Sequence, residues 1–194
     1  MRNRWNINDN RWLKEDAANV APVLLRLREE NGRCYQRIVD TIRLILPFFS
    51  DFELEPHYDS LLLNWRERNS DQVFSVSQAS DGMLRVVALV TLLLLPEQDL
   101  PDVLILDEPE LGLHPYAINV VGGLIHAVST KIQVIVATQS MPLIDCFEPT
   151  DIVVVEREGR SSVFRRLDAN ALAEWLEDYS LSELWEKNVI GGRP

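Results

Sequence analysis

VLILDEPELGLHP, residues 103–115, is the stretch from which the architecture of this chain can be worked out. Four apolar residues lead into Asp107 and Glu108, a pattern typical of a buried strand in a parallel sheet covered on both faces. Ligands of α/β proteins gather at this end of the strands. One carboxylate there can hold Mg²⁺, and its neighbour can orient or deprotonate an attacking water. A solvated acidic turn after a buried strand explains the same residues, so the stretch alone leaves both interpretations open.

The segments that follow continue the α/β pattern. HPYAINVVGGLIHAVST, residues 114–130, has the spacing of a crossover helix, and IQVIVA, residues 132–137, is a second buried strand. Each glycine of the pair at 122 and 123 costs about 1 kcal/mol relative to alanine in a helix. We therefore expect either a close helix contact there or a weak helix. Two more strands and two short helices are predicted at 151–157, 161–167 and within 169–188.

The N-terminal part has a different pattern. Residues 19–30 and 34–46 carry apolar residues at helical spacing, and Asn31-Gly32 between them predicts a helical hairpin. Three short alternating stretches follow, as expected for antiparallel strands with one face in water. We therefore predict a first domain over 1–78, with the hairpin and the antiparallel strands, and a second, α/β domain over 79–194.

Two further segments place polar residues where a ligand could bind. ATQS, residues 137–140, ends the second buried strand, so the Gln139 amide is predicted beside the two carboxylates if the strands are neighbours. Alternatively, Gln139 and Ser140 cap the next helix. SDGM, residues 80–83, opens a long apolar helix whose free N–H groups and dipole make an anion site. Helix capping by Ser80 explains that segment equally well.

Together these segments resemble the motifs of ABC-type ATPases. SDGMLR resembles the signature motif in the Ser-Asp-Gly form of SMC-like and RecF-like proteins, LILDEP resembles Walker B, ELGLHP the D-loop and ATQS the switch loop. The helical hairpin and the ending LWEKNVIGGRP also resemble bacterial AAA family ATPases of RecF/SMC type. The resemblance implies an α/β fold, the C-terminal portion of a P-loop NTPase, with a mostly parallel sheet and flanking helices.

The resemblance also implies roles for individual residues. Asp107 binds Mg²⁺, Glu108 acts as the general base, and Gln139 senses the γ-phosphate of ATP. Many ABC ATPases have histidine where Gln139 stands, which argues against fast hydrolysis. The residues implied to bind ATP, from the signature motif and the D-loop across a dimer interface, are Ser80, Asp81, Gly82, Met83 and His114.

The Walker A pattern Gly-x-x-x-x-Gly-Lys-Ser/Thr, which cradles the β- and γ-phosphates, does not occur in these 194 residues. In the family its strand lies between those corresponding to IQVIVA and DIVVVE. We therefore expect this chain to be a C-terminal half that is not competent alone, with a gap in its sheet. Either a chain carrying the missing P-loop fills the gap, or the strands close up and two copies self-associate.

Composition restricts the partners. A net charge of −11 argues against wrapping nucleic acid over the whole surface, and only the first 50 residues carry more basic than acidic side chains. Arg26, Arg33 and Arg37 form either a basic face or an ordinary solvated face. The sequence shows no signal peptide and no apolar run long enough for a membrane span, which predicts a cytoplasmic protein without membrane contact.

Three functions remain open at this stage. The chain is part of an ATPase, a non-catalytic module for dimerisation or regulation, or a nucleic-acid-binding fragment that uses its N-terminal arginines. The two carboxylates favour the first function for the native context, while the missing P-loop leaves open whether this chain is an enzyme alone. A DNA or nuclease partner follows only by analogy with related proteins.

Overall fold

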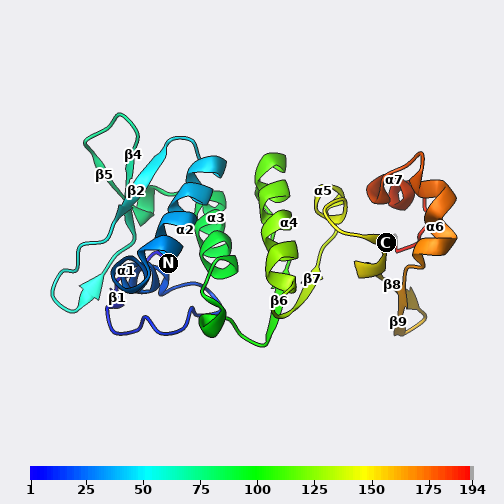
Figure 1. Cartoon of the computed structure of the whole chain (residues 1–194), viewed down its shortest axis with the longest axis horizontal. Helices are drawn as coiled ribbons and strands as arrows, with labels where there is room; N and C mark the ends of the chain where they lie inside the picture. The colour runs from blue at the N-terminus through cyan, green and yellow to red at the C-terminus, as the bar shows by residue number, and fades with distance from the viewer. Residues whose placement is uncertain (193–194) are drawn as a thin grey trace.

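Two helices form the first layer of the computed structural model, which describes residues 1–192 (Figure 1). α1 spans Val20–Glu30 and α2 spans Gly32–Ile45. The Asn31 side chain between them accepts a hydrogen bond from the N–H of Cys34 and so caps α2. The predicted helical hairpin is confirmed.

Short antiparallel strands pack beside this hairpin. β2, β4 and β5 form a sheet in that order, and β1 pairs separately with β3. Phe52 of β2 lies opposite Trp65 of β4, and both are buried, whereas the next pair along the strands, Glu53 and Asn64, is partly exposed and Arg66 is exposed. The predicted alternation with one face in water is confirmed. The bounds are β1 Trp5–Asn6, β2 Phe49–Glu53, β3 Ser60–Leu61, β4 Asn64–Glu67, β5 Val73–Ser75 and the 3₁₀ turn η1 Val76–Gln78.

The long apolar helix α3, Asp81–Leu93, joins the two parts of the molecule. It packs against α2 on one side and against α4, Pro115–Ser129, on the other (Figure 1). Val87 and Val90 belong to the apolar cluster of the hairpin, while Leu89 and Leu93 belong to a second cluster with β6 and α4. α3 therefore contributes to two cores at once.

The second part contains the predicted β-α-β unit. β6, Val103–Asp107, pairs in parallel with β7, Gln133–Ala137, and α4 connects them. Two short elements flank the unit, the 3₁₀ turn η2 at Glu97–Asp99 and the helix α5 at Met141–Ile144. The predicted α/β class is confirmed, and the β6–β7 pair is its parallel part.

The last segment forms a hairpin with two short helices. β8, Val153–Glu158, pairs antiparallel with β9, Ser161–Arg166, so the two strands predicted here form a sheet of their own. A third apolar cluster joins this hairpin to the terminal helices. The remaining bounds are η3 Pro149–Asp151, α6 Ala169–Leu176 and α7 Leu181–Glu186.

Within residues 1–192, β7 and β8 do not pair, so the strands do not close up across the predicted gap. One face of β6–β7 is covered, because Leu104 and Leu106 are buried. The other face is open: Val103, Ile105 and Ile135 are 45%, 70% and 48% exposed. The expectation of a sheet covered on both faces is therefore wrong for this chain by itself. Among the helices described, none is both long enough and apolar enough to cross a bilayer.

Candidate functional site

The N-terminus of α3 lies at the surface. Ser80 is exposed, and its hydroxyl accepts a hydrogen bond from the N–H of Met83 at 3.1 Å. Met83 itself is buried. The first-turn N–H groups of Asp81 and Gly82 have no acceptor within the helix, because the first turn of any helix lacks one. Ser80 therefore caps the helix and still leaves two N–H groups for an anion.

The carboxylates of Asp107 and Glu108 stand at the end of β6. Both residues are exposed, and neither takes part in any ion pair among residues 1–192. Asp107 lies opposite Ala137 in the parallel register, and the N–H of Glu108 donates to the Ala137 carbonyl at 2.8 Å. The two carboxylates are thus adjacent to the segment that carries Gln139, which is also exposed.

Glu108 has an unusual backbone conformation. Its φ angle of +43° lies in the left-handed region, which residues other than glycine rarely adopt. Its carbonyl accepts hydrogen bonds from the N–H of Leu111 at 3.1 Å and from Nη1 of Arg85 at 3.0 Å. Such backbone outliers cluster at functional sites when their surroundings hold them in place.

A second brace joins the two strand ends. The Thr138 hydroxyl donates to Oε1 of Glu110 and accepts from the N–H of Ser140 at 2.9 Å. The other carboxylate oxygen of Glu110 is buried and has no hydrogen-bond partner among residues 1–192. Ser140 stands at the N-cap of α5 but makes no side-chain cap bond, so side-chain capping does not explain this serine.

The D-loop residues touch α3. Gly112 has a φ of +77°, and a Cβ atom built on Gly82 would lie 2.8 Å from the Gly112 carbonyl oxygen. Glycine at position 82 is therefore required for this close approach. His114 is exposed and caps α4, since its Nδ1 accepts from the N–H of Tyr116 at 3.2 Å. His114 can thus offer only Nε2 to another group.

Sequence reasoning missed three residues that brace this region, Arg85, Glu110 and Thr138. Each lies inside a quoted motif. A single polar side chain forms no periodic pattern, however, so the sequence did not indicate which distant residue it would contact. Their contacts join α3 to β6 and β6 to β7. An ion pair also joins α3 to the N-terminal segment of the chain, because Arg2 donates to Oδ1 of Asp81 at 2.6 Å.

The donor set can be tested against Mg²⁺. No group of three or more His, Cys, Asp or Glu side chains within residues 1–192 could hold a metal ion. Mg²⁺ in nucleotide sites commonly uses only one or two carboxylates and takes its other ligands from phosphate and water. The exposed, unpaired Asp107 fits that mode of binding.

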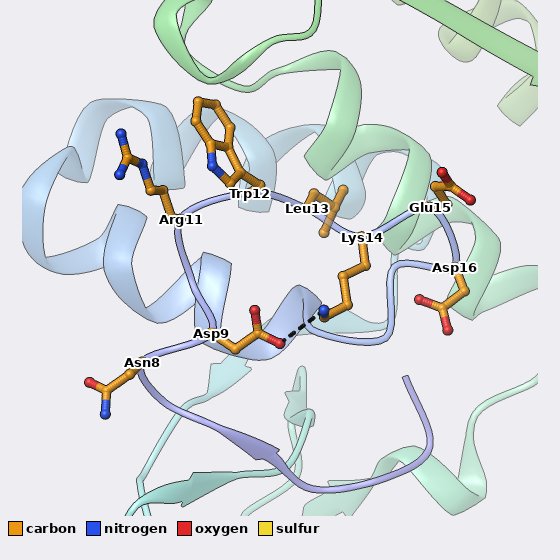
Figure 2. Close-up of a pocket in the computed structure, with 8 residues that line it drawn as sticks. All are labelled: Asn8, Asp9, Arg11, Trp12, Leu13, Lys14, Glu15 and Asp16. Atoms are coloured by element: carbon orange, nitrogen blue, oxygen red, sulfur yellow. Dashed lines mark ion pairs between the residues drawn. The ribbon is translucent and has the colours of Figure 1, made fainter.

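A surface hollow of about 660 Å³ lies elsewhere, along the loop of residues 8–16 (Figure 2). The buried Asn19 side chain fixes this loop by donating to the carbonyls of Asp9 and Trp12, and an ion pair joins Asp9 to Lys14 at 3.3 Å. None of the quoted motifs lines the hollow. The chemistry-bearing residues therefore gather at the ends of β6 and β7 and not in this hollow.

Comparison with known families agrees with this arrangement. The family model described as "AAA domain, putative AbiEii toxin, Type IV TA system" matches residues 2–145. The chain belongs to this AAA domain family. The match includes α3 and the ends of β6 and β7, together with the hairpin that precedes them. No curated protein matches the chain.

Solved structures similar to this AAA domain are heads of SMC ATPases. One, from work on ATP-driven dimerization and DNA-stimulated activation of SMC ATPases, is 19% identical with a TM-score of 0.58, covering 81% of this chain and 96% of its own. An Smc head bound to the C-terminal winged-helix domain of ScpA is 17% identical with a TM-score of 0.62, covering 87% of this chain and 50% of its own.

A third structure is an Smc head with an extended coiled coil from Pyrococcus furiosus, bound to the C-terminal domain of ScpA. It is 19% identical with a TM-score of 0.60, covering 82% of this chain and 40% of its own. The AAA domain thus spans half or less of the length of two of these three structures. At these identities the likeness shows the fold. By family the chain is an AAA domain, and its fold is similar to that of the SMC ATPase structures.

Proposed function

We propose that this AAA domain binds and hydrolyses ATP at an interface between two ATPase subunits, after a segment with a glycine-rich phosphate loop has joined its sheet. The observation that carries the proposal is that the candidate site residues lie close together at the C-terminal ends of β6 and β7. There, Asp107 and Glu108 adjoin the Gln139 segment, and Arg85 and Gly82 bring α3 against the same turn and the D-loop.

The residues divide the chemistry between them. Asp107 would hold Mg²⁺, which would supply positive charge to the phosphate oxygens of ATP. The exposed Glu108 carboxylate, which has no ion-pair partner among the described residues, accepts a proton from the attacking water. The Gln139 amide orients that water or donates to the γ-phosphate. Many ABC ATPases have histidine at this position, and with glutamine in its place we expect slow turnover.

Residues of α3 serve the opposite subunit in this proposal. The Ser80 hydroxyl and the N–H groups of Asp81 and Gly82 bind the γ-phosphate held by the partner, and the buried Met83 contributes only the N–H bond that orients Ser80. His114, whose Nδ1 is occupied, contributes Nε2 from the D-loop. A twofold-symmetric dimer then contains two equivalent sites.

The open sheet surface supports docking of the phosphate-loop segment. Among residues 1–192, β7 has a strand neighbour on one edge only, and β8 pairs only with β9. Val103, Ile105 and Ile135 expose apolar surface beside that edge. An open strand edge with an apolar face favours pairing with a further strand. The segment can belong to the same polypeptide or to another one.

One of the arginines expected to bind nucleic acid, Arg26, is already engaged in contacts within the protein. The Arg26 side chain is 16% exposed and donates to Oδ2 of Asp99 at 2.7 Å and to the Asn10 carbonyl. A guanidinium engaged in this way is not free for a phosphate backbone. The second alternative is a module that dimerises without catalysis. The absence of ATP binding in both arms of the following experiment would favour it.

The test is calorimetry of ATP with Mg²⁺, using the 194-residue chain alone and then mixed with a polypeptide that carries the family's phosphate-loop segment. We expect ATP binding and slow hydrolysis only in the mixture. Glu108→Gln should retain binding and abolish hydrolysis, because the amide cannot accept the proton. Unchanged turnover in this variant would exclude Glu108 as the base.

Ile105→Lys tests the docking surface. The side chain is 70% exposed, so this substitution should leave the fold intact while placing a charge on the surface that the added segment covers. We expect it to abolish binding of the phosphate-loop polypeptide. Exposed Leu44→Lys on α2 is the matched control and should bind normally. Equal binding by both variants would contradict docking on this face.

A further inference from the structure

Arg85 connects α3 to the turn that carries Glu108. It lies five positions after Ser80, is half-buried, and donates from Nη1 to the carbonyl oxygen of Glu108 at 3.0 Å. This bond joins residues 23 positions apart in the sequence. None of the seven ion pairs among residues 1–192 includes Arg85.

The Glu108 backbone needs such support. Its left-handed φ of +43° is strained for a residue with a side chain, and it persists only where neighbouring contacts hold it. Two of those contacts are local to the strand ends, from the Glu108 N–H to the Ala137 carbonyl and from the Leu111 N–H to the Glu108 carbonyl. Arg85 supplies the third contact, which comes from the helix α3.

A second contact ties the same helix to the same turn. The Gly82 backbone approaches the Gly112 carbonyl so closely that a Cβ atom would lie 2.8 Å from it. α3 therefore touches the 108–112 segment at two points, Arg85 on Glu108 and Gly82 on Gly112. A displacement of the first turns of α3 must displace this segment as well, because packed backbone does not compress.

We propose that Arg85 is a positioning residue for the Glu108 carboxylate, and that it couples the two ATP sites of a dimer through the interior of one chain. This inference rests on the proposed function. α3 meets the phosphate of the opposite subunit, whereas Glu108 serves the ATP of its own subunit. Through Arg85, occupation of one site fixes the base of the other, which makes hydrolysis cooperative.

The first test needs no ATP and uses the full chain. Hydrogen exchange of the segment 106–113 is compared between the wild type, Arg85→Ala, Arg85→Lys and the control Arg33→Ala on α2. Loss of the Arg85 bond should speed exchange of the Leu111 N–H about fivefold or more, because the turn opens locally more often. Arg85→Lys should restore part of the protection. Unchanged exchange in Arg85→Ala, with the same global stability, would overturn the proposal.

The second test uses the mixture that hydrolyses ATP. Arg85→Ala should lower kcat about tenfold while KM changes less than about twofold, because the substrate contacts persist and the base is misaligned. If Arg85 couples the two sites, Arg85→Ala should also make the dependence of rate on ATP concentration less steep. A larger KM with unchanged kcat would contradict the positioning role.

The two tests separate two kinds of failure. If the wild-type mixture does not hydrolyse ATP, the proposed function fails, while hydrogen exchange still reports whether Arg85 holds the Glu108 turn. If the mixture hydrolyses ATP and the Arg85→Ala rate is normal, the proposed function stands and the positioning role is wrong.

Discussion

The sheets β2-β4-β5 and β6-β7 differ in what they present to water. Each buries apolar side chains on one face, Phe52 and Trp65 in the first sheet, Leu104 and Leu106 in the second. The outer face of the first sheet carries charged side chains, including the ion pair between Arg66 and Glu53. The outer face of the second sheet carries valine and isoleucine, exposed by as much as 70% at Ile105.

This difference shows which part of the molecule is complete. A sheet with one polar face is stable when that face lies in water, whereas an exposed apolar face favours burial by about 25 cal/mol for each Å² that another segment covers. The hairpin and its antiparallel sheet therefore have no need of a partner. The β6–β7 sheet has two exposed carboxylates, Asp107 and Glu108, at one end and an uncovered apolar face.

Two phenylalanines on strands provide the largest expected contrast in stability. Phe49 of β2 is fully buried and packs edge-on against Phe52, whereas Phe164 of β9 is 70% exposed. Phe49→Ala should lower the free energy of unfolding by about 3–5 kcal/mol, because it leaves a cavity in the core. Phe164→Ala should change it by less than about 0.5 kcal/mol. Urea denaturation measures both, and a large loss at Phe164 would break the comparison.

The glycine pair of α4 shows that the helix-covered side of the second part is tightly packed. A Cβ atom on Gly122 would lie 2.6 Å from Sγ of Cys146, while one on Gly123 would meet nothing within 4 Å. Gly122→Ala should therefore cost about 1–3 kcal/mol by forcing Cys146, two residues after the end of α5, away from α4. Gly123→Ala should stabilise the helix by about 1 kcal/mol. Equal shifts in Tm for the two variants would contradict the close approach of α4 and α5.

The smallest expected effect is a pH dependence in the first part. Burial, followed by the hydrogen bond that its hydroxyl donates to Asp51 at 2.6 Å, raises the pKa of Tyr35 above its ordinary value. The folded state therefore keeps this proton at pH values where the unfolded state has lost it. Stability is complete below about pH 10 and falls above it, by at most about 1.4 kcal/mol per pH unit.

Tyr35→Phe should remove that part of the decline. Between about pH 9.5 and pH 11 the wild type should lose more free energy of unfolding than this variant does. Tyr58→Phe is the matched control, because Tyr58 is 88% exposed and should keep the wild-type slope. Parallel pH profiles for the wild type and Tyr35→Phe would show that the Tyr35 hydroxyl is not held in the folded state.

Much of the fold could be predicted because it is written in local patterns. The apolar spacing of α1 and α2, the Ser80 cap of α3 and the apolar runs of β6 and β7 each depend on residues close in sequence. The parallel pairing of β6 with β7 follows from a strand, a helix and a strand in succession. The glycine pair predicted either a close helix contact or a weak helix, and only the structure decides for a close contact, at Gly122 and not at Gly123.

The sequence by itself determined the order of helices and strands, the membership in the AAA domain family and the residues proposed for its chemistry, since motifs consist of neighbours along the chain. Only the tertiary structure decided that one face of β6–β7 is uncovered and that Arg85 and Gly82 of α3 reach Glu108 and Gly112. Burial and contact depend on how distant segments pack in space, and no spacing of residues along the chain encodes them directly.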